Sequence, residues 1–325
     1  MAERRGATVE LRAVTKRYGE TVAVNELSFT VPAGRICVLV GPSGCGKTTS
    51  LRMVNRLIEP TTGEILIDGQ NVLTEEPTAL RRRIGYVIQQ TGLFPHQTVA
   101  DNIATVPRLL GWASERIAAR VEELLRLVGL DPERMRHRYP AQLSGGERQR
   151  VGVARAMAAE PPLMLMDEPF GAVDPIVRTR LQDEFLNLQR TLGITVIFVT
   201  HDIDEAIKLG DRVAVMRAGR LVQYSPPAEL LAHPADDFVA QFVGHDRALK
   251  RLGLLTVGGI ELDRGIDRGR LDGAPTIAPS TTVRDALAAM LVADARAAAV
   301  VDGDRYLGAI TLPAIGRMLR GDDAT

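Results

Sequence analysis

The stretch GPSGCGKTTS constrains the fold of this chain more than any other feature. It follows the apolar run ICVLV and precedes a segment that can continue as a helix. Gly41, Gly46, Lys47 and Thr48 fill the pattern G-x-x-x-x-G-K-[ST], in which backbone N–H groups surround phosphate oxygens at a helix N-terminus. The sequence therefore predicts a strand, loop and helix that bind a nucleoside triphosphate. Kinases, GTPases, helicases and transporters all use such a loop, so the rest of the chain must identify the class.

Composition bounds the class of protein. The chain has 325 residues, 45% of them hydrophobic, which is enough for one large core or two smaller ones. Lys plus Arg and Asp plus Glu each number 40, and this balance gives no support for a nucleic-acid partner. No run approaches the roughly 18 uncharged apolar residues of a membrane span, and the N-terminus lacks a signal-peptide core. We therefore expect a chain that neither crosses a membrane nor is exported.

The two cysteines indicate the compartment. Cys37 lies in a predicted buried strand and Cys45 lies inside the phosphate loop, where a disulfide would distort the site. We expect both thiols to be reduced, as in the cytoplasm.

Short apolar runs alternate with amphipathic helical patterns along most of the chain. The runs ICVLV, LMLMDE, TVIFVT and RVAVM are typical of buried strands in a mostly parallel sheet. The stretch from about Thr98 to Glu160 is predicted to be largely helical, so the α/β alternation carries a helical insertion. A segment rich in glycine and charge, roughly 246–274, is predicted to be a linker. Residues 275–320 then show the order helix, strand, turn, strand, helix, which predicts a small second domain.

Two further motifs carry chemistry. The run LMLMDEP places Asp167 and Glu168 at the carboxyl end of a predicted buried strand. There, Asp167 can help hold Mg²⁺ through water and Glu168 can polarise an attacking water, although such an acidic pair is also common in loops. The run LSGGERQRV starts a predicted helix at Ser144, Gly145 and Gly146, whose backbone donors and helix dipole form a second anion site. The chain therefore carries two separate phosphate-binding segments.

With these motifs, residues 8 to about 245 resemble the nucleotide-binding subunit of an ATP-binding-cassette (ABC) transporter. The resemblance implies an α/β fold: a phosphate-loop NTPase cassette over residues 1–245, with a RecA-like core and the helical insertion at about 98–160. It also implies ATP and Mg²⁺ as ligands. In that family the signature helix of one subunit faces the phosphate loop of its partner, so a head-to-tail homodimer encloses two ATP molecules.

The remaining landmarks of the family follow in order. Tyr18, in VTKRYGE, matches the aromatic residue that stacks on adenine. Gln89, in GYVIQQTGLFPH, matches the glutamine that senses Mg²⁺ and water beside the membrane subunit, and its neighbour Gln90 is the alternative. His201, in FVTHD, matches the switch histidine that touches the γ-phosphate. Asp174, in GAVDP, falls in the dimer-crossing loop, although the commoner form begins Ser-Ala-Leu; this departure leaves cross-site communication open.

The resemblance assigns roles to individual residues. It implies catalytic roles for Glu168, His201 and Gln89. It implies that Thr48, Gln89 and Asp167 hold Mg²⁺. The residues expected to contact the nucleotide are Tyr18, Gly41, Pro42, Ser43, Gly44, Cys45, Gly46, Lys47, Thr48, Thr49, Ser144, Gly145, Gly146, Glu147 and Asp174.

A narrower resemblance concerns the transported solute. The runs IGYVIQQTGLFPH, MDEPFGAVDPI and FVTHDIDEAIKLGDRVAVM resemble ATPase subunits of osmoprotectant importers for glycine betaine, carnitine, choline or proline betaine. Such a subunit implies transmembrane permease partners, an indirect substrate-binding protein partner and a place at the cytoplasmic face of the membrane. The alternatives are an importer for another small solute and a soluble cassette ATPase that acts on DNA or ribosomes. Solute choice lies in the partners, so this sequence does not decide it.

The C-terminal residues are expected to regulate. In this importer family the C-terminal domains are often cystathionine-β-synthase-like (CBS) repeats, and residues 275–320 look like one such repeat. A helix at Thr282 to Leu291 argues against the OB-type barrel of sugar and polyamine importers. Because CBS repeats work in pairs, we expect the single unit to pair with its copy across the homodimer, where it either senses a signal or serves only as a clamp.

Overall fold

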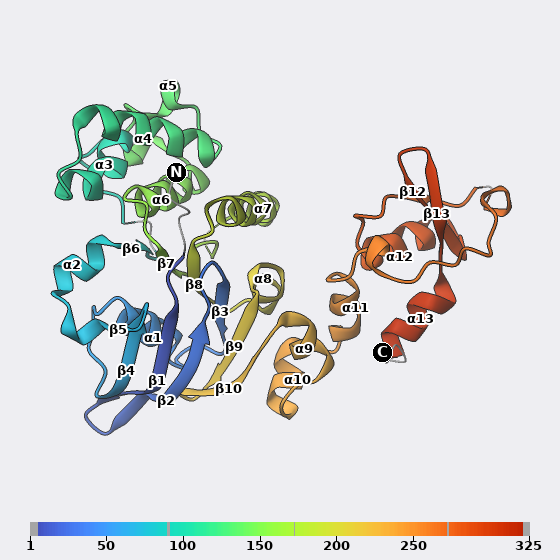
Figure 1. Ribbon diagram of the computed structural model, residues 1–325, viewed down its shortest axis with the longest axis horizontal. Helices are drawn as coiled ribbons and strands as arrows, with labels where there is room; N and C mark the ends of the chain where they lie inside the picture. The colour runs from blue at the N-terminus through green and yellow to red at the C-terminus, as the bar shows by residue number, and fades with distance from the viewer. Residues whose placement is uncertain (1–5, 90–91, 172, 272, 321–325) are drawn as a thin grey trace. The chain divides into compact units, whose positions relative to one another are not determined.

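A computed structural model describes residues 6–89, 92–171, 173–271 and 273–320, and Figure 1 shows their helices and strands. The chain divides into two compact units, Met1–Pro226 and Pro227–Thr325. No helix in the described ranges combines the length and apolar character that crossing a bilayer requires.

A six-stranded sheet in the order β10-β9-β3-β8-β7-β6 forms the centre of the first unit. β6, β7, β8, β3 and β9 pair in parallel, whereas β10 pairs antiparallel with β9. Every residue of β3, β7 and β8 is buried, as expected for parallel strands covered on both faces. The prediction of a mostly parallel sheet is therefore confirmed. The strands are β3 (Ile36–Val40), β6 (Ile84–Val87), β7 (Leu163–Asp167), β8 (Thr195–Thr200), β9 (Arg212–Arg217) and β10 (Arg220–Ser225).

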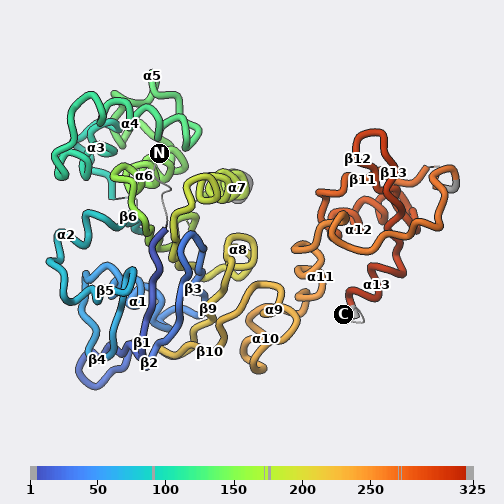
Figure 2. The backbone as a smooth tube through the Cα atoms, viewed as in Figure 1, coloured from blue at the N-terminus to red at the C-terminus, as the bar shows by residue number. Residues whose placement is uncertain are grey.

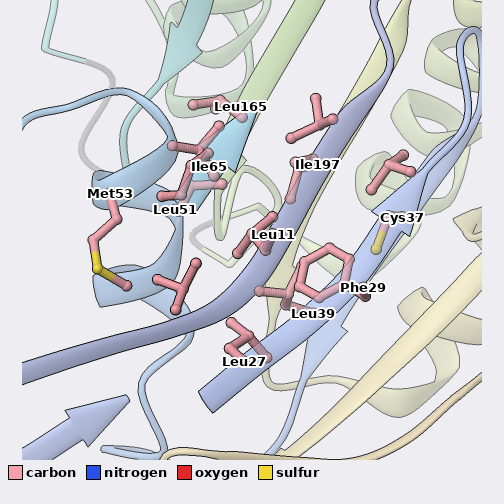
Figure 3. Packing of buried hydrophobic residues seen from close by; sticks show 14 of the residues in the cluster. Leu11, Leu27, Phe29, Cys37, Leu39, Leu51, Met53, Ile65, Leu165 and Ile197 are labelled. Carbon is pink, nitrogen blue, oxygen red and sulfur yellow. The ribbon is translucent and has the colours of Figure 1, made fainter. Parts of the chain in front are cut away.

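A second, antiparallel sheet packs against the first. Its order is β2-β1-β4-β5. Figure 3 shows Leu11 and Leu27 of this sheet beside Leu39 of the parallel sheet, and Leu51 of α1 lies in the same buried cluster. The core between the two sheets therefore fixes the strand and helix that flank the phosphate loop. The elements are β1 (Val9–Tyr18), β2 (Thr21–Val31), α1 (Lys47–Val54), β4 (Thr62–Ile67) and β5 (Gln70–Asn71).

Helices connect the parallel strands. Between β6 and β7 the chain forms the predicted helical insertion, in which Thr98 caps α3 by accepting a hydrogen bond from the N–H of Asp101. α7 and α8 are the crossovers from β7 to β8 and from β8 to β9. Figure 1 labels these strands, and Figure 2 traces the backbone through α7 and α8. Besides α1, the α-helices of the first unit are α2 (Pro77–Arg82), α3 (Val99–Leu109), α4 (Ser114–Leu127), α5 (Pro132–Met135), α6 (Gly145–Met157), α7 (Pro175–Leu192) and α8 (Ile203–Leu209). The 3₁₀ helices of this unit are η1 (Val72–Thr74) and η2 (Pro140–Gln142).

The second unit has its own small sheet in the order β11-β12-β13. From β11 onward the elements follow the order β-α-β-β-α, which contains the predicted order and adds one short strand before it. Thr282 caps α12 by accepting from the N–H of Asp285 at 3.1 Å. The helices are α9 (Pro227–Ala232), α10 (Asp237–Val243), α11 (Arg247–Leu252), η3 (Val257–Gly259), η4 (Arg268–Arg270), α12 (Val283–Val292) and α13 (Leu312–Arg320). The strands are β11 (Thr276–Ile277), β12 (Ala297–Asp302) and β13 (Arg305–Thr311).

The segment 246–274 is not a loose linker. It contains α11, η3 and η4, and Leu252 and Val257 are fully buried in the same core as Val283. The N–H of Val257 donates to the carbonyl of Thr281 at 2.8 Å. Single apolar residues between glycines show no period, so the sequence pattern did not reveal this packing. The division after Pro226 also differs from the expected boundary at 245, while the CBS-like identity of residues 275–320 stays a prediction.

Candidate functional site

The phosphate loop joins β3 to α1 through two glycines that the surrounding backbone requires. Gly41 has φ +152°, and a Cβ there would lie 2.2 Å from the carbonyl oxygen of Met216 on β9. Gly46 has φ +101°, and a Cβ there would lie 2.5 Å from the carbonyl oxygen of Ala23 on β2. Both distances are shorter than real Cβ contacts, so neither position accepts a side chain. The loop is therefore held in one shape by the two sheets around it.

Lys47 places a positive charge on this loop. Its side chain is 6% exposed, and Nζ donates to the carbonyl oxygens of Gly41 at 2.7 Å and Pro42 at 3.0 Å. These partners are neutral, so the ammonium and the first turn of α1 favour an anion at the same place. The predicted contacts Pro42, Ser43 and Gly44 are exposed, whereas Thr48 and Thr49 are partly buried. The crest of the loop is thus open to a ligand.

Both cysteines are free and buried. Burial raises the pKa of the Cys37 thiol to about 12, and burial also raises the pKa of the Cys45 thiol. Deprotonation is disfavoured at both, so neither is a reactive thiolate at neutral pH.

Thr48 and Asp167 meet across neighbouring elements. The Thr48 hydroxyl donates to Asp167 Oδ1 at 3.0 Å, and Asp167 is 5% exposed at the end of β7. Burial raises the pKa of Asp167 and the charge of Glu168 adds to this rise, whereas the hydrogen bond from Thr48 opposes it. Hydroxyl and carboxylate oxygens beside a phosphate loop fit Mg²⁺. This ion usually retains several water ligands and is bound by one or two protein oxygens together with oxygens of a nucleotide phosphate. In the described residues no group of three or more His, Cys, Asp or Glu could hold a metal ion by itself.

Three predicted catalytic residues converge at the ends of adjacent strands. Gln89 follows β6, Glu168 follows β7 and His201 follows β8. Gln89 Nε2 donates to Glu168 Oε2 at 2.9 Å, and His201 Nδ1 lies 3.1 Å from Glu168 Oε1. Glu168 has φ +45°, which is rare for a side chain of this size and is held by its N–H bond to the carbonyl of Val199. The alternative Gln90 lies outside the described residues.

Tyr18 lies on the hairpin beside the phosphate loop. It ends β1, pairs with Thr21 of β2, and is 51% exposed. Ala23, two residues further along β2, provides the carbonyl that excludes a side chain at Gly46. The exposed phenol ring is therefore on the same hairpin that contacts the loop, in a position where a base can stack on it.

Ser144 and Glu147 form a complete capping box at the start of α6. The N–H of Ser144 donates to Glu147 Oε2 at 2.7 Å, and the N–H of Glu147 lies 3.2 Å from Ser144 Oγ. The Ser144 N–H lowers the pKa of Glu147, so this carboxylate stays ionised. The glycines between them are unconstrained: neither has a positive φ, and a Cβ on Gly145 or Gly146 would meet no atom closer than 3.6 Å. Nothing described in this chain requires glycine there, which fits close approach by another molecule.

Asp174 precedes α7 and is exposed. Arg178 connects this segment to the turn that carries His201. Its backbone N–H donates to the Asp174 carbonyl, Nη2 donates to the Val173 carbonyl at 3.0 Å, and Nη1 lies 3.8 Å from Asp202 Oδ2. Ala172 lies outside the described residues, so the effect of the departure in GAVDP stays a prediction.

Sequence reasoning missed the buried polar residues that hold the site. Asn102 on α3 is fully buried; its Oδ1 accepts from the N–H of Phe94, and Nδ2 lies within 3.2 Å of the carbonyls of Phe94, Gln97 and Thr98. The amide therefore fixes the backbone of residues 94–98. An amide on the buried face of an amphipathic helix was the available signal.

The chain is similar to proteins of a known family. A family model described as "ABC transporter" matches residues 24–171. The chain is 52% identical over 303 residues to the osmoprotectant import ATP-binding protein OsmV of Salmonella typhimurium, covering 91% of this chain and 77% of that protein. It is 54% identical over 243 residues to the glycine betaine/carnitine/choline transport ATP-binding protein OpuCA of Bacillus subtilis, covering 74% of this chain. The chain spans 64% of the length of that relative, which is less than two thirds.

A solved structure has the same fold as the first unit. The ATP-binding cassette MJ0796, described as a dimer in a post-hydrolysis state bound to ADP and Pi, is 33% identical with a TM-score of 0.61. The match covers 67% of this chain and 98% of that one. The matched 67% of the chain is close to the fraction of the 325 residues that belongs to the first unit, Met1–Pro226.

Proposed function

Because the chain belongs to the ABC transporter family, we propose that it is the ATP-hydrolysing subunit of a binding-protein-dependent importer for quaternary-amine osmoprotectants. The observation that carries the proposal is the 52% identity over 303 residues to an osmoprotectant import protein. Because the whole chain has 325 residues, that similarity extends beyond the cassette into the second unit. Glycine betaine, carnitine, choline and proline betaine are the proposed solutes.

The geometry supports ATP binding at the phosphate loop. The loop N–H groups and Lys47 bind the phosphates, and Tyr18 stacks on the adenine. Thr48 and Asp167, together with Gln89, would hold Mg²⁺, and the ion would neutralise phosphate charge when bound. Both loop glycines and the 3.0 Å pair of Thr48 and Asp167 support this assignment.

Glu168 is the proposed base for hydrolysis. Gln89 and His201 hold its two carboxylate oxygens at 2.9 and 3.1 Å, so the carboxylate is oriented before water arrives. The carboxylate accepts a proton from the attacking water. The other side of the His201 ring is left for a γ-phosphate oxygen.

The second phosphate-binding segment supports a homodimer. Ser144, Gly145, Gly146 and Glu147 are proposed to complete the site of a partner copy, with Asp174 near the crossing point. The glycines at the start of α6 support this arrangement, because a Cβ there would meet no close atom of this chain and a missing Cβ lets another molecule approach the backbone. The related cassette MJ0796 is described as dimeric.

The proposed membrane partner contacts the surface from Gln89 to His96. Phe94 is 39% exposed there, and the Arg155 guanidinium lies 6.0 Å from its ring and donates to the Gly92 carbonyl. Closure and opening of the cassette dimer at the cytoplasmic face would drive two permease subunits, with a separate binding protein supplying solute. The CBS-like unit is proposed to pair with its copy and bias closure.

Solute uptake tests the proposal. Cells lacking this chain are grown at high osmolarity with glycine betaine, carnitine, choline or proline betaine, and labelled uptake is measured after the wild-type chain or Glu168→Gln is restored. We expect uptake of at least one of these amines with the wild-type chain and none with Glu168→Gln, which should bind ATP and remain closed. Wild-type hydrolysis by Glu168→Gln would refute its assigned role. Co-purification with ribosomes or DNA, without a membrane protein, would favour the soluble ATPase instead.

A further inference from the structure

Glu205 is a buried carboxylate that the mechanism above does not use. It lies on α8, is 5% exposed, and accepts hydrogen bonds at both oxygens. The Thr200 hydroxyl donates to Oε2 at 2.6 Å, and Gln182 Nε2 donates to Oε1 at 3.1 Å. Burying a carboxylate costs several kcal/mol unless such partners offset it. A crossover helix that needed only packing would place an apolar residue at this position.

The partners of Glu205 enclose the backbone of His201. Thr200 is the last residue of β8 and Asp202 caps α8, so His201 is the single residue between them. The Thr200 hydroxyl, while donating to Glu205, accepts from the N–H of Asp202 at 3.0 Å. Asp202 Oδ1 in turn accepts from the N–H of Glu205 at 3.3 Å. The turn that presents His201 is thus held on both sides by one hydrogen-bond network, in which Thr200 and Glu205 are buried and Asp202 is partly exposed.

The same network reaches the segment before α7. Gln182 belongs to α7, and Arg178, one turn earlier, lies 3.8 Å from Asp202 and donates to the Val173 carbonyl. Displacement of α7 therefore acts on Asp202 through Arg178, and on Thr200 through Gln182 and Glu205. His201 itself is 61% exposed and its described side-chain partner is Glu168, so the ring depends on its backbone for placement.

We infer that Glu205 is a positioning residue: with Thr200 and Gln182 it fixes the turn that holds His201 against Glu168. The inference rests on the proposed ATPase function. It predicts that loss of the network slows hydrolysis without weakening ATP binding, because none of these three side chains is assigned to the nucleotide.

Variants of the full chain test the network. Thr200→Val removes one hydroxyl at nearly constant volume, and Glu205→Ala removes both hydrogen bonds. Each should lower kcat about tenfold or more, because small displacements of reacting groups have effects of this order. KM for Mg-ATP should change little. Glu205→Gln should retain most activity, because reversal of the Gln182 amide restores a hydrogen bond at both positions.

The matched control is Lys208→Ala. Lys208 joins the same two helices through an exposed ion pair with Asp183 at 2.8 Å, outside the network. The Lys208→Ala variant should have the same kcat and KM as the wild-type chain. An equal loss of kcat in Lys208→Ala would show that general contact between α7 and α8 matters, and would overturn the role of Glu205.

A double-mutant cycle with His201→Ala assigns the effect to the histidine. We expect Glu205→Ala to add no further loss of kcat in the His201→Ala background, whereas additive losses would refute the inference. NMR of the histidine rings gives a readout without turnover. Glu205→Ala and Thr200→Val should shift the His201 signals and leave those of His96, His137, His233 and His245 in place; unshifted His201 signals would also refute it. Absence of ATP hydrolysis by the wild-type chain would count against the proposed function, and the NMR result would still decide the inference.

Discussion

Gly46 and Gly146 each stand at the start of a helix, yet their surroundings differ. Gly46 has φ +101° and faces the carbonyl of Ala23 at a distance that excludes a Cβ. Gly146 has room for a Cβ, whose nearest neighbour would be Val177 at 3.6 Å. The first glycine is required by the chain's own fold, whereas the second is left open by it. The contrast separates a preformed half-site from a half-site shaped for another molecule.

The largest effect is expected at the charge of the preformed half-site. Lys47→Ala should weaken ATP binding roughly 100-fold, because charge-assisted hydrogen bonds to the phosphates are lost. Titration calorimetry with Mg-ATP measures this, and Lys208→Ala is the control lysine outside the site. Similar affinity in Lys47→Ala and wild type would place the nucleotide elsewhere.

A methyl group distinguishes the two half-sites. Gly46→Ala should lower the free energy of unfolding by about 2 kcal/mol. A side chain at this position strains the backbone at φ +101°, and its Cβ would lie only 2.5 Å from the Ala23 carbonyl oxygen, so the loop must shift. The variant should also bind ATP more weakly. Denaturant unfolding measures the change in stability, and titration calorimetry measures the change in ATP affinity. An unchanged stability would mean that the loop relaxes without cost and is less preformed than its contacts suggest.

The matched substitution in the open half-site should behave differently. Gly146→Ala should leave stability unchanged or raise it by up to about 1 kcal/mol, since alanine favours the helix. ATP binding by one chain should persist, while hydrolysis by the dimer falls about tenfold, equivalent to about 1.4 kcal/mol of transition-state stabilisation. Full hydrolysis in this variant would remove the argument for a closely approaching partner.

The smallest effect on catalysis is expected from the second unit. Removal of residues 247–325 should change basal hydrolysis by no more than about twofold, because the assigned site residues all precede Pro227. The salt or nucleotide dependence of uptake in vesicles should change. A cut at 270 is less informative, because it leaves Leu252 and Val257 without the core that buries them. If the dependence of uptake on salt or nucleotide did not change, the second unit would have no sensing role and would serve only to hold the dimer together.

The sequence predicts best where local pattern and chemistry coincide. The phosphate loop, the strand ends that present Asp167 and His201, and the α6 start all carry residue types with a specific backbone or ligand role. The antiparallel sheet was not foreseen, because β1 mixes buried and exposed positions with register shifts and so shows no clean alternation. Glu205 and Asn102 were also missed, because a polar residue in a helix ordinarily faces solvent, and only tertiary packing buries it.

The hydrogen bonds of Asn102 affect how fast another molecule can bind to residues 94–98. Fixing an irregular loop costs conformational entropy, roughly 1–2 kcal/mol for each residue ordered. The buried Asn102 amide orders residues 94–98 when the chain folds, so this conformational entropy is already lost before a second molecule binds. A molecule that binds this loop therefore meets a rigid surface, and the rate of encounter, not loop ordering, should limit association. Heat capacity changes on binding should then reflect the contact area alone.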